Sequence, residues 1–347
     1  MGLRANYLIT GVAAALFAAA SPAAQFKLAT VAPEGSQWMQ ELRAGADELS
    51  AATEDRVKLK FYTGGVMGND KKVLRKIRIG QLQGGAFTSS GLSERYRDIM
   101  VYGIPLLFRD QAEVDFVRER LDPTLEAGLE EAGLVSLGFA GGGFAKLMGS
   151  SPVDSLEQLR GQKIWVPEGD QVTYVSLDVL SLSPVVLPIT DVLTGLQTGL
   201  IDYIATPPVA AVLLQWYTKV SYITDFPLAY TLGVLAVDKK SFARLAPSDQ
   251  VKFRDIMGRA YQRVDAASRI DNVSADAALI ENGLSVIDPG EAEFARWQEL
   301  RSQVLERLGG DGVVSETILS ELDGYLQEYR QASNPAAAVQ TSAAPIE

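Results

Sequence analysis

The feature that most constrains the fold is an alternation of strand-like and helix-like segments that occurs twice along the chain. In residues 159–207 a polar turn leads into a short apolar strand, and two pairs of helix and strand follow. Such a βαβαβ unit forms a parallel sheet that presents ligands at the carboxyl ends of its strands. Trp165 lies in the first of these strands, close to its carboxyl end. The pattern therefore predicts an α/β protein with a large aromatic side chain facing a cleft.

The other copy of the pattern occupies residues 26–88. Its strands alternate polar and apolar residues, and its helices carry apolar residues at helical spacing. The predicted elements are a strand at Phe26–Val31, a helix at Trp38–Ser50, a strand at Val57–Tyr62, a basic helix at Asp70–Ile79 and a strand ending at Thr88. Because the same unit is used twice, we expect two similar halves.

Two segments are suited to connect these halves. A predicted strand at Leu134–Phe139 is followed by Gly141-Gly142-Gly143, a flexible point where the chain can cross between domains. A helix is predicted to begin at Pro247 and to run without a breaker to about Asn282. At 1.5 Å per residue it would be about 50 Å long, enough to pass along both halves. Further strands are expected at Tyr222–Asp225 and Tyr230–Val237.

Composition limits the functions open to this chain. Its 347 residues leave room for two domains, and a hydrophobic content of 47% is enough for a sizeable core. A formal net charge of −11 argues against nucleic-acid binding, which needs clustered cationic contacts to phosphates. The absence of His and Cys excludes thiol nucleophiles, His general bases, Cys/His zinc sites and disulfides. No Gly-x-Ser-x-Gly elbow is present either, so we expect neither an enzyme nor a cofactor.

The two ends of the chain differ in composition from the rest. Arg4 precedes an apolar run at Leu8–Ala20, and small residues follow it, which is typical of a secretory signal peptide over residues 1–24. The run is shorter than the roughly 20 residues that span a bilayer. Residues 332–347 are rich in Ala and Pro without periodicity, which predicts a disordered tail. We therefore expect an exported, soluble protein that acts in the periplasm.

Several short segments stand in a specific order and spacing. They are Gly64–Gly68 with Ile79–Leu82, then Ile104–Phe108, Leu159–Ile164 and Leu196–Asp202. In this order they resemble the substrate-binding proteins of TRAP transporters, the DctP family, and the resemblance covers about residues 26–330. It implies a periplasmic binding protein fold: two lobes with parallel or mixed sheets and flanking helices, joined by crossing strands and one long helix that spans both.

The resemblance also implies how such a protein works. The lobes would close on a small-molecule ligand, and the closed protein would deliver it to a permease made of a small and a large membrane subunit. We expect lobe I at residues 25–143 with about 234–262, lobe II at 144–233 with about 263–310, and a C-terminal helix at 311–331.

Members of the family usually bind organic acids, and this chain departs from them at the residues implied to do so. The family places an Arg after a Lys-Ile dipeptide, where it pairs with a carboxylate in a bidentate manner, but here Trp165 occupies that position. A second Arg of the family aligns with Ala145, an Asn aligns with Thr206, and a His falls near Phe226. The resemblance therefore implies a site that lacks the usual carboxylate clamp.

A cleft of this composition would suit a hydrophobic, amphipathic or neutral ligand. Its expected walls are aromatic, and the candidates are Trp165, Phe144, Phe87, Tyr203 and Trp38. Trp and Tyr still offer one N–H or O–H each to orient a polar end of the ligand. Glu168 and Asp170 could contact a polar or cationic head group. The alternatives stay open: each aromatic residue could be core packing, and both acids could be solvated loop residues.

Three functions are compatible with these observations. The first is the periplasmic receptor of a TRAP transporter for a hydrophobic or neutral ligand. The second is a periplasmic carrier or sensor that passes hydrophobic ligands to an additional periplasmic partner protein rather than to the permease. The third is a receptor for an organic acid with a single carboxylate. Because one sequence does not identify the ligand, the geometry of the cleft has to discriminate among them.

Overall fold

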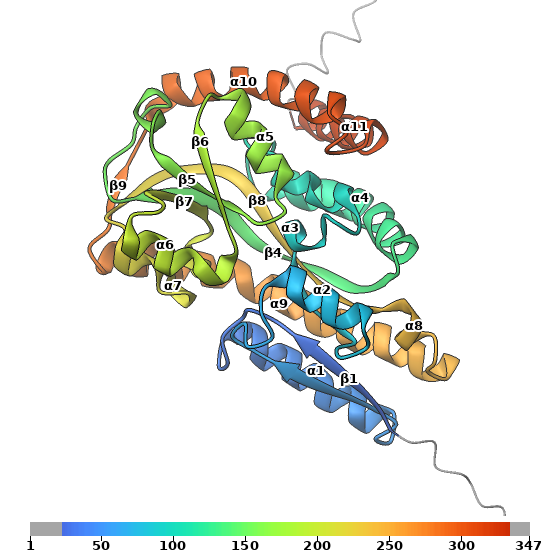
Figure 1. Cartoon of the computed structure of the whole chain (residues 1–347). Helices are drawn as coiled ribbons and strands as arrows, with labels where there is room; N and C mark the ends of the chain where they lie inside the picture. The colour runs from blue at the N-terminus through green and yellow to red at the C-terminus, as the bar shows by residue number, and fades with distance from the viewer. Residues whose placement is uncertain (1–22, 334–347) are drawn as a thin grey trace, which may run out of the picture.

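The computed structural model describes residues 23–333 of the α/β fold (Figure 1). The predicted signal peptide lies outside the described residues except for its last two, and the predicted tail lies outside them except for its first two. No helix in residues 23–333 is both long enough and apolar enough to cross a membrane.

The first region of the molecule is the βαβαβ unit predicted near the N-terminus. It comprises β1 (Ala24–Ala29), α1 (Gln37–Ala52), β2 (Val57–Tyr62), α2 (Asp70–Arg78) and β3 (Gly84–Thr88), followed by α3 (Ser89–Leu92) and α4 (Gln111–Glu131). Strand β1 lies between β2 and β3 and is parallel to both. Each helix starts at a side-chain cap, since Ser36 accepts from Met39 N–H and Asn69 from Lys72 N–H.

The second region is the other predicted βαβαβ unit. It comprises β5 (Lys163–Pro167), α5 (Gln171–Val179), β6 (Ser183–Leu187), α6 (Val192–Thr198), β7 (Tyr203–Thr206) and α7 (Pro208–Leu213). Strand β5 is parallel to both β6 and β7. Its core surrounds the buried side chains of Trp165 and Trp216. The sequence analysis predicted this alternation of strands and helices, and a 3-10 turn at Ile189–Asp191 precedes α6.

Two long antiparallel strands, β4 (Leu134–Gly149) and β8 (Tyr222–Asp238), join the regions. The strand order β2-β1-β3-β8-β4-β7-β5-β6 is continuous because β8 pairs with β3, and β4 pairs with β7. The strands expected at Tyr222–Asp225 and Tyr230–Val237 form one continuous strand, β8, whose pairing with β4 shifts register between them and leaves residues 225–228 without a partner on β4. The glycine run in β4 is a register shift rather than a break, and Gly143 adopts a φ of 99°, which a residue with a Cβ avoids.

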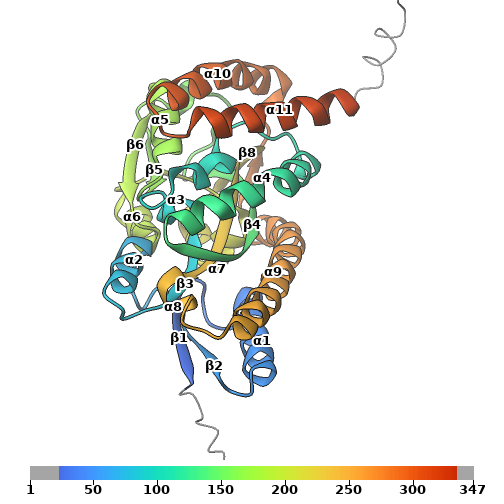
Figure 2. The same ribbon diagram turned by 90° about the vertical axis from the view of Figure 1, so that its right-hand side faces the viewer.

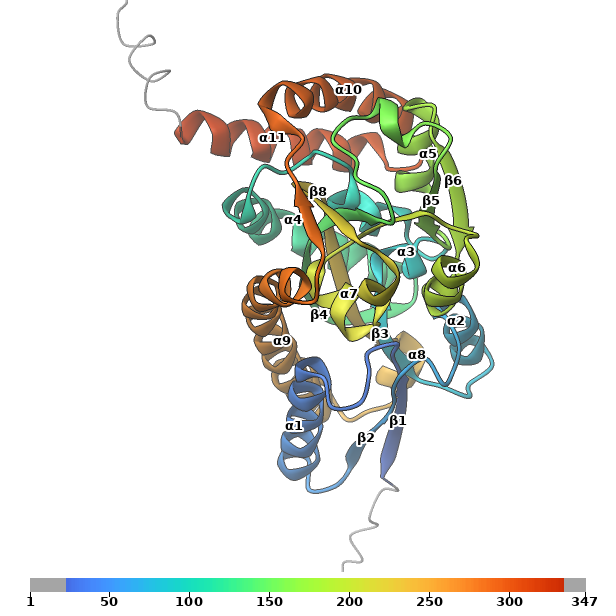
Figure 3. The same ribbon diagram turned by 90° about the vertical axis from the view of Figure 1, so that its left-hand side faces the viewer.

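The predicted long helix is α9 (Pro247–Glu281), which begins with Pro at its first turn. It packs against α1 of the first region, against β4 and against α7 of the second region, so it contacts both (Figure 3). Buried and exposed residues alternate along the sequence of this helix, so one side of it faces the core and the other faces solvent. It therefore acts as a common support for the two regions.

The C-terminal part covers the end of the molecule opposite β1 and β2 (Figure 2). Short α8 (Lys239–Phe242) precedes α9, and β9 (Ser285–Ile287) pairs with β8. Helix α10 (Gly290–Gly310) packs against α5, and α11 (Glu316–Ala332) against α4. A bidentate ion pair from Arg330 to the buried Glu113 fastens α11 to α4, at 2.7 Å and 2.8 Å.

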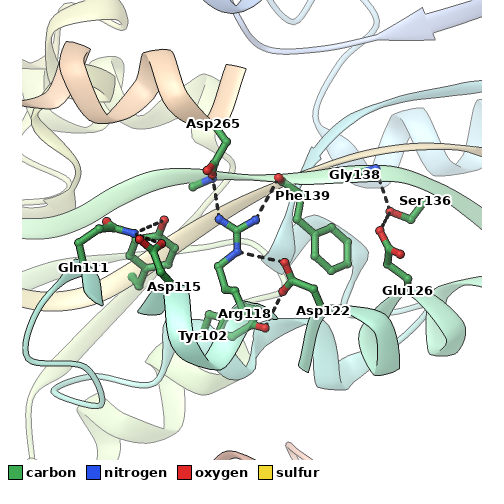
Figure 4. Close-up of polar contacts among 12 residues, drawn as sticks. Tyr102, Gln111, Asp115, Arg118, Asp122, Glu126, Ser136, Gly138, Phe139 and Asp265 are labelled. Carbon is green, nitrogen blue, oxygen red and sulfur yellow. Dashed lines mark hydrogen bonds and ion pairs between the residues drawn. The ribbon is translucent and has the colours of Figure 1, made fainter. Parts of the chain in front are cut away.

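A largely buried group of polar residues holds β4 just before it crosses to the second region (Figure 4). Arg118 of α4 donates to Asp265 of α9 at 2.8 Å, to the Phe139 carbonyl at 3.1 Å and to Asp122 at 3.1 Å. Asp265 also accepts from the backbone N–H of Gly141 at 2.5 Å. We call Tyr102, Arg118, Asp122, Phe139 and Asp265 the crossing network, because together they tie α4, β4 and α9 to one another.

Candidate ligand-binding site

A cavity of about 310 Å³ lies between the first and second regions. Its wall includes the carboxyl ends of β3, β5 and β7, at Thr88, Pro167 and Thr206, and the β5–α5 loop that follows Pro167. The crossing strand β8 contributes residues from Leu228 to Gly233. A ligand at this place would contact both regions at once, as expected for α/β sheets that bind at strand carboxyl ends.

Trp165 is both part of the core and part of the cavity wall. Its side chain is 4% exposed and meets Trp216 edge-on, with ring centroids 5.2 Å apart. Its indole N–H donates to the Leu187 carbonyl at 3.0 Å. The N–H that was expected to orient a polar ligand is therefore already bonded to β6. What Trp165 offers to the cavity is apolar surface.

The other predicted aromatic residues divide into two groups. Phe87 and Trp38 line the cavity, and Trp38 also packs edge-on against Tyr261. Phe144, Tyr203 and Phe226 are absent from the residues that line it within the described part of the chain. Phe144 packs against Tyr230, and Phe226 packs against Trp297. The Tyr203 hydroxyl donates to the Ser151 carbonyl at 3.1 Å, so its hydrogen is already bonded to a main-chain oxygen.

The remaining candidates also lie at the cavity, and the two acids among them are bonded to protein. Ala145 and Thr206 are buried in the wall, with 3% and 4% of their surface exposed. Asp170 caps α5 by accepting from the N–H and hydroxyl of Thr173, and its burial raises the pKa of its carboxyl. Glu168 accepts from the Asn69 amide at 2.5 Å. The structure thus brings Trp165, Ala145, Phe87, Trp38, Thr206 and Glu168 to one cavity.

The sequence analysis missed several residues of the wall, among them Asp70, Thr88 and Tyr230. Asp70 begins α2, and its carboxylate accepts from the N–H and hydroxyl of Thr88 at 3.0 Å and 2.7 Å. Burial raises the pKa of the Asp70 carboxyl to about 6. The position of Thr88 at the end of a predicted strand was a usable signal, because parallel strands place their carboxyl ends at the site.

The charged residues of the wall are mainly acidic. Carboxylates come from Asp70, Glu94, Glu168 and Asp170, whereas the one ammonium belongs to Lys71, and no arginine of residues 23–333 lines the cavity. Lys71 lies 3.1 Å from Glu94 and 4.0 Å from Glu168, so its charge is already compensated. Within the same residues no cluster of acidic groups is arranged to hold a metal ion. A carboxylate ligand would therefore meet like charges and no bidentate partner.

Two α/β regions, crossing strands and a cavity between them define the architecture of a periplasmic solute-binding protein. Residues 28–309 match the bacterial extracellular solute-binding protein family 7, DctP, and the chain belongs to this family. The family consists of solute-binding proteins rather than enzymes, so the expectation that the chain is not an enzyme is confirmed. The predicted fold class and the predicted membership among TRAP substrate-binding proteins are confirmed as well.

Similar proteins bind several solutes. The chain is 22% identical over 271 residues to the C4-dicarboxylate-binding periplasmic protein DctP of Rhodobacter capsulatus, which covers 76% of this chain and 81% of that protein. It is 23% identical over 290 residues to the sialic acid-binding protein SiaP of Vibrio cholerae, with 80% and 87% covered. The match to the 2,3-diketo-L-gulonate-binding protein YiaO of Escherichia coli, at 25% identity, spans 59% of this chain and 62% of that protein.

Solved structures show the same fold. A TRAP solute-binding protein from Xanthobacter autotrophicus with bound β-D-galacturonate superposes with a TM-score of 0.80 at 22% identity, covering 87% of this chain and 99% of that one. The Bordetella pertussis receptor DctP7, which binds pyroglutamic acid, gives the same TM-score and coverage at 20% identity. These superpositions establish a shared fold but not a shared ligand.

Proposed function

We propose that this protein is the periplasmic substrate-binding subunit of a TRAP transporter and that its ligand is neutral, apolar or amphipathic. The observation that carries the ligand class is that no arginine lines the cavity within residues 23–333, whereas Trp165 and Ala145 do. Enclosing a carboxylate without a cation costs several kcal/mol of desolvation. A dicarboxylate should therefore bind poorly in this cavity.

In the proposed mechanism two lobes close on the ligand. Lobe I comprises residues 25–143 with about 234–262, and lobe II comprises residues 144–233 with about 263–310. Ligand contacts from both sides of the cavity favour the closed state, because only that state offers both sets of contacts at once. The loaded protein then docks on the small and large membrane subunits of a permease.

A receptor for an organic acid is the second candidate function. It is favoured by the ligands of related structures, which include β-D-galacturonate and pyroglutamic acid. Lys71 is the cation in the described part of the wall that could meet such an acid. To do so it would have to leave Glu94 and Glu168. A carrier or sensor that works with a separate periplasmic partner shares the proposed ligand class, and permease genes beside this gene would argue against it.

Binding of matched probes tests the ligand class. N-phenyl-1-naphthylamine is neutral and apolar with a single N–H, and we expect it to bind with micromolar affinity and enhanced fluorescence. Succinate and D-glucuronate should give no heat of binding in calorimetry at the same protein concentration. Native mass spectrometry of the freshly purified protein should reveal any co-purified apolar ligand. Micromolar binding of either acid would contradict the proposal.

Trp165→Arg is the sharpest single variant for this question. It should abolish binding of the naphthylamine and create affinity for carboxylates. Because Trp165 also packs on Trp216, Trp165→Phe is the control that keeps an apolar wall and loses the bond to Leu187. We expect Trp165→Phe to fold and to bind the naphthylamine within about threefold of the parent, as a lost hydrogen bond outside the ligand contact allows. If Trp165→Arg folds and changes neither affinity, Trp165 is packing alone.

A further inference from the structure

Two segments far apart in the sequence meet across one side of the cavity. From the first region come Asn69 and Lys71 of the α2 start and Ser93 after α3, and from the second region comes the β5–α5 loop with Glu168 and Gly169. The Asn69 amide donates to Glu168 at 2.5 Å, and the Ser93 hydroxyl donates to the Gly169 carbonyl at 2.9 Å. The Lys71 ammonium lies 4.0 Å from Glu168. We call these five residues the rim latch.

Gly169 allows the closest approach between the two regions at this rim. Its φ is 90°, a conformation that residues with a Cβ rarely adopt. A Cβ placed there would lie 2.7 Å from the backbone oxygen of Ser90 in the first region. That oxygen belongs to the main chain, so it cannot rotate away as a flexible side chain could. A residue larger than glycine therefore holds the two regions apart.

The rim latch is built from groups that water can reach. The side chains of Lys71 and Glu168 keep 52% and 36% of their surface exposed. Exposed ion pairs are weak and are exchanged easily with water. All five residues also line the cavity, so their separation would open it on this side. Contacts of this kind can form when the regions approach and break when they part.

We infer that Glu168 and Gly169 are positioning residues that hold the closed state and set the rate of ligand release, rather than contacts that recognise the ligand. The inference rests on the proposed closure of two lobes. Glu168 acts through Asn69 and Lys71 of the opposite region, and Gly169 acts by letting the loop reach the Ser90 main chain. Loss of either should favour the open form and speed the release of a bound ligand.

The test measures closure directly, with or without a ligand. Since the chain has no Cys, spin labels can be placed by Asp47→Cys on α1 and Asp178→Cys on α5, two exposed positions in different regions. Double electron–electron resonance then measures the distance between the two labels. In the full-length protein we expect a population at short distances, and Gly169→Ala should shift it to longer ones. Identical distance distributions in Gly169→Ala and the parent, with and without N-phenyl-1-naphthylamine, would overturn the latch.

The rate of ligand release provides a second test of the rim latch. In stopped-flow displacement of N-phenyl-1-naphthylamine, Glu168→Ala should release the probe about threefold to tenfold faster with little change in association rate, as expected for one weak ion pair and one hydrogen bond. The matched control is Glu157→Ala, which removes an exposed glutamate whose partner Arg160 belongs to the same region. An equal effect of both variants, or none in Glu168→Ala, argues against the latch. Should the naphthylamine fail to bind at all, the ligand class is wrong, and the spin-label distances still decide the latch.

Discussion

The crossing network and the rim latch both join parts of the molecule through ion pairs and hydrogen bonds, but they differ in burial. Arg118 and Asp265 of the crossing network keep 12% and 16% of their side-chain surface exposed, compared with 52% and 36% for Lys71 and Glu168. A buried charge without its partner is costly, whereas an exposed charge regains its water. The comparison teaches that this protein is fastened firmly where β4 crosses and only lightly at the rim of the cavity.

This difference fits the proposed closure. Residues 139–141 of β4 are held to α4 and α9 by groups that cannot separate without leaving buried charge. Within the glycine run, the Asn272 amide of α9 donates to the Gly142 carbonyl at 2.7 Å, so the same helix also holds the crossing point itself. The rim has no comparable burial, and a small free energy from ligand contacts is enough to shift its balance. The following variants are arranged from the largest expected effect to the smallest.

Removing a partner from the crossing network should have the largest effect. We expect Asp265→Ala to lower the free energy of unfolding by about 2–4 kcal/mol, because the Gly141 N–H loses its acceptor and Arg118 keeps only Asp122 as an ionic partner in a largely buried place. Urea unfolding measured by circular dichroism gives this quantity. Asp271→Ala on the same helix is the control and should stay within about 0.5 kcal/mol. A loss below about 1 kcal/mol in Asp265→Ala would mean that the crossing is no firmer than the rim.

The carboxyl of Asp70 in the cavity wall should make stability depend on pH. Because burial raises its pKa to about 6 in the folded state, the unfolded chain ionises first as pH rises from about 4. Stability is therefore lost between about pH 4 and pH 6 and stays lower above that, by at most about 3 kcal/mol. Relative to the parent, Asp70→Asn should gain stability over this range in urea unfolding at several pH values. The exposed Asp154→Asn serves as the control, and parallel pH profiles of all three proteins would contradict the prediction.

Gly169→Ala should affect closure more than stability. The strained φ should cost about 1 kcal/mol of unfolding free energy if the loop keeps its conformation, and less if the two regions part. Small-angle scattering should then report a larger radius of gyration than in the parent. A loss of several kcal/mol with unchanged dimensions would show that the rim is a rigid part of the fold.

Glu168→Ala should change stability least, by less than about 0.5–1 kcal/mol, because its partner Lys71 is exposed and also pairs with Glu94. The parent should approach the variant at 1 M NaCl, where screening weakens exposed ion pairs. Asp265→Ala should keep its deficit at the same salt concentration, since buried pairs are screened much less. Equal salt responses in the two variants would remove the distinction between the network and the latch.

The secondary structure followed closely from the sequence where periodicity was strong. The strand at 57–62 and the long helix that begins at Pro247 were predicted at or close to their observed bounds, because alternation and helical spacing are local properties. The glycine run after Phe139 was predicted as a crossing point, and it does lie where β4 passes between the regions. Its conformation as a register shift within one long strand depends on the partner strand β8, which no local pattern reveals.

The site shows the same division. Chain order and segment spacing were enough to indicate the class of receptor and the neighbourhood of Trp165, since the carboxyl ends of parallel strands are where such sheets bind. Only the tertiary structure decided that the Trp165 N–H is taken by Leu187, that Phe144, Tyr203 and Phe226 are not among the described residues that line the cavity, and that Glu168 meets Asn69. The physical reason is that hydrogen-bond partners and burial depend on residues brought together from distant parts of the chain.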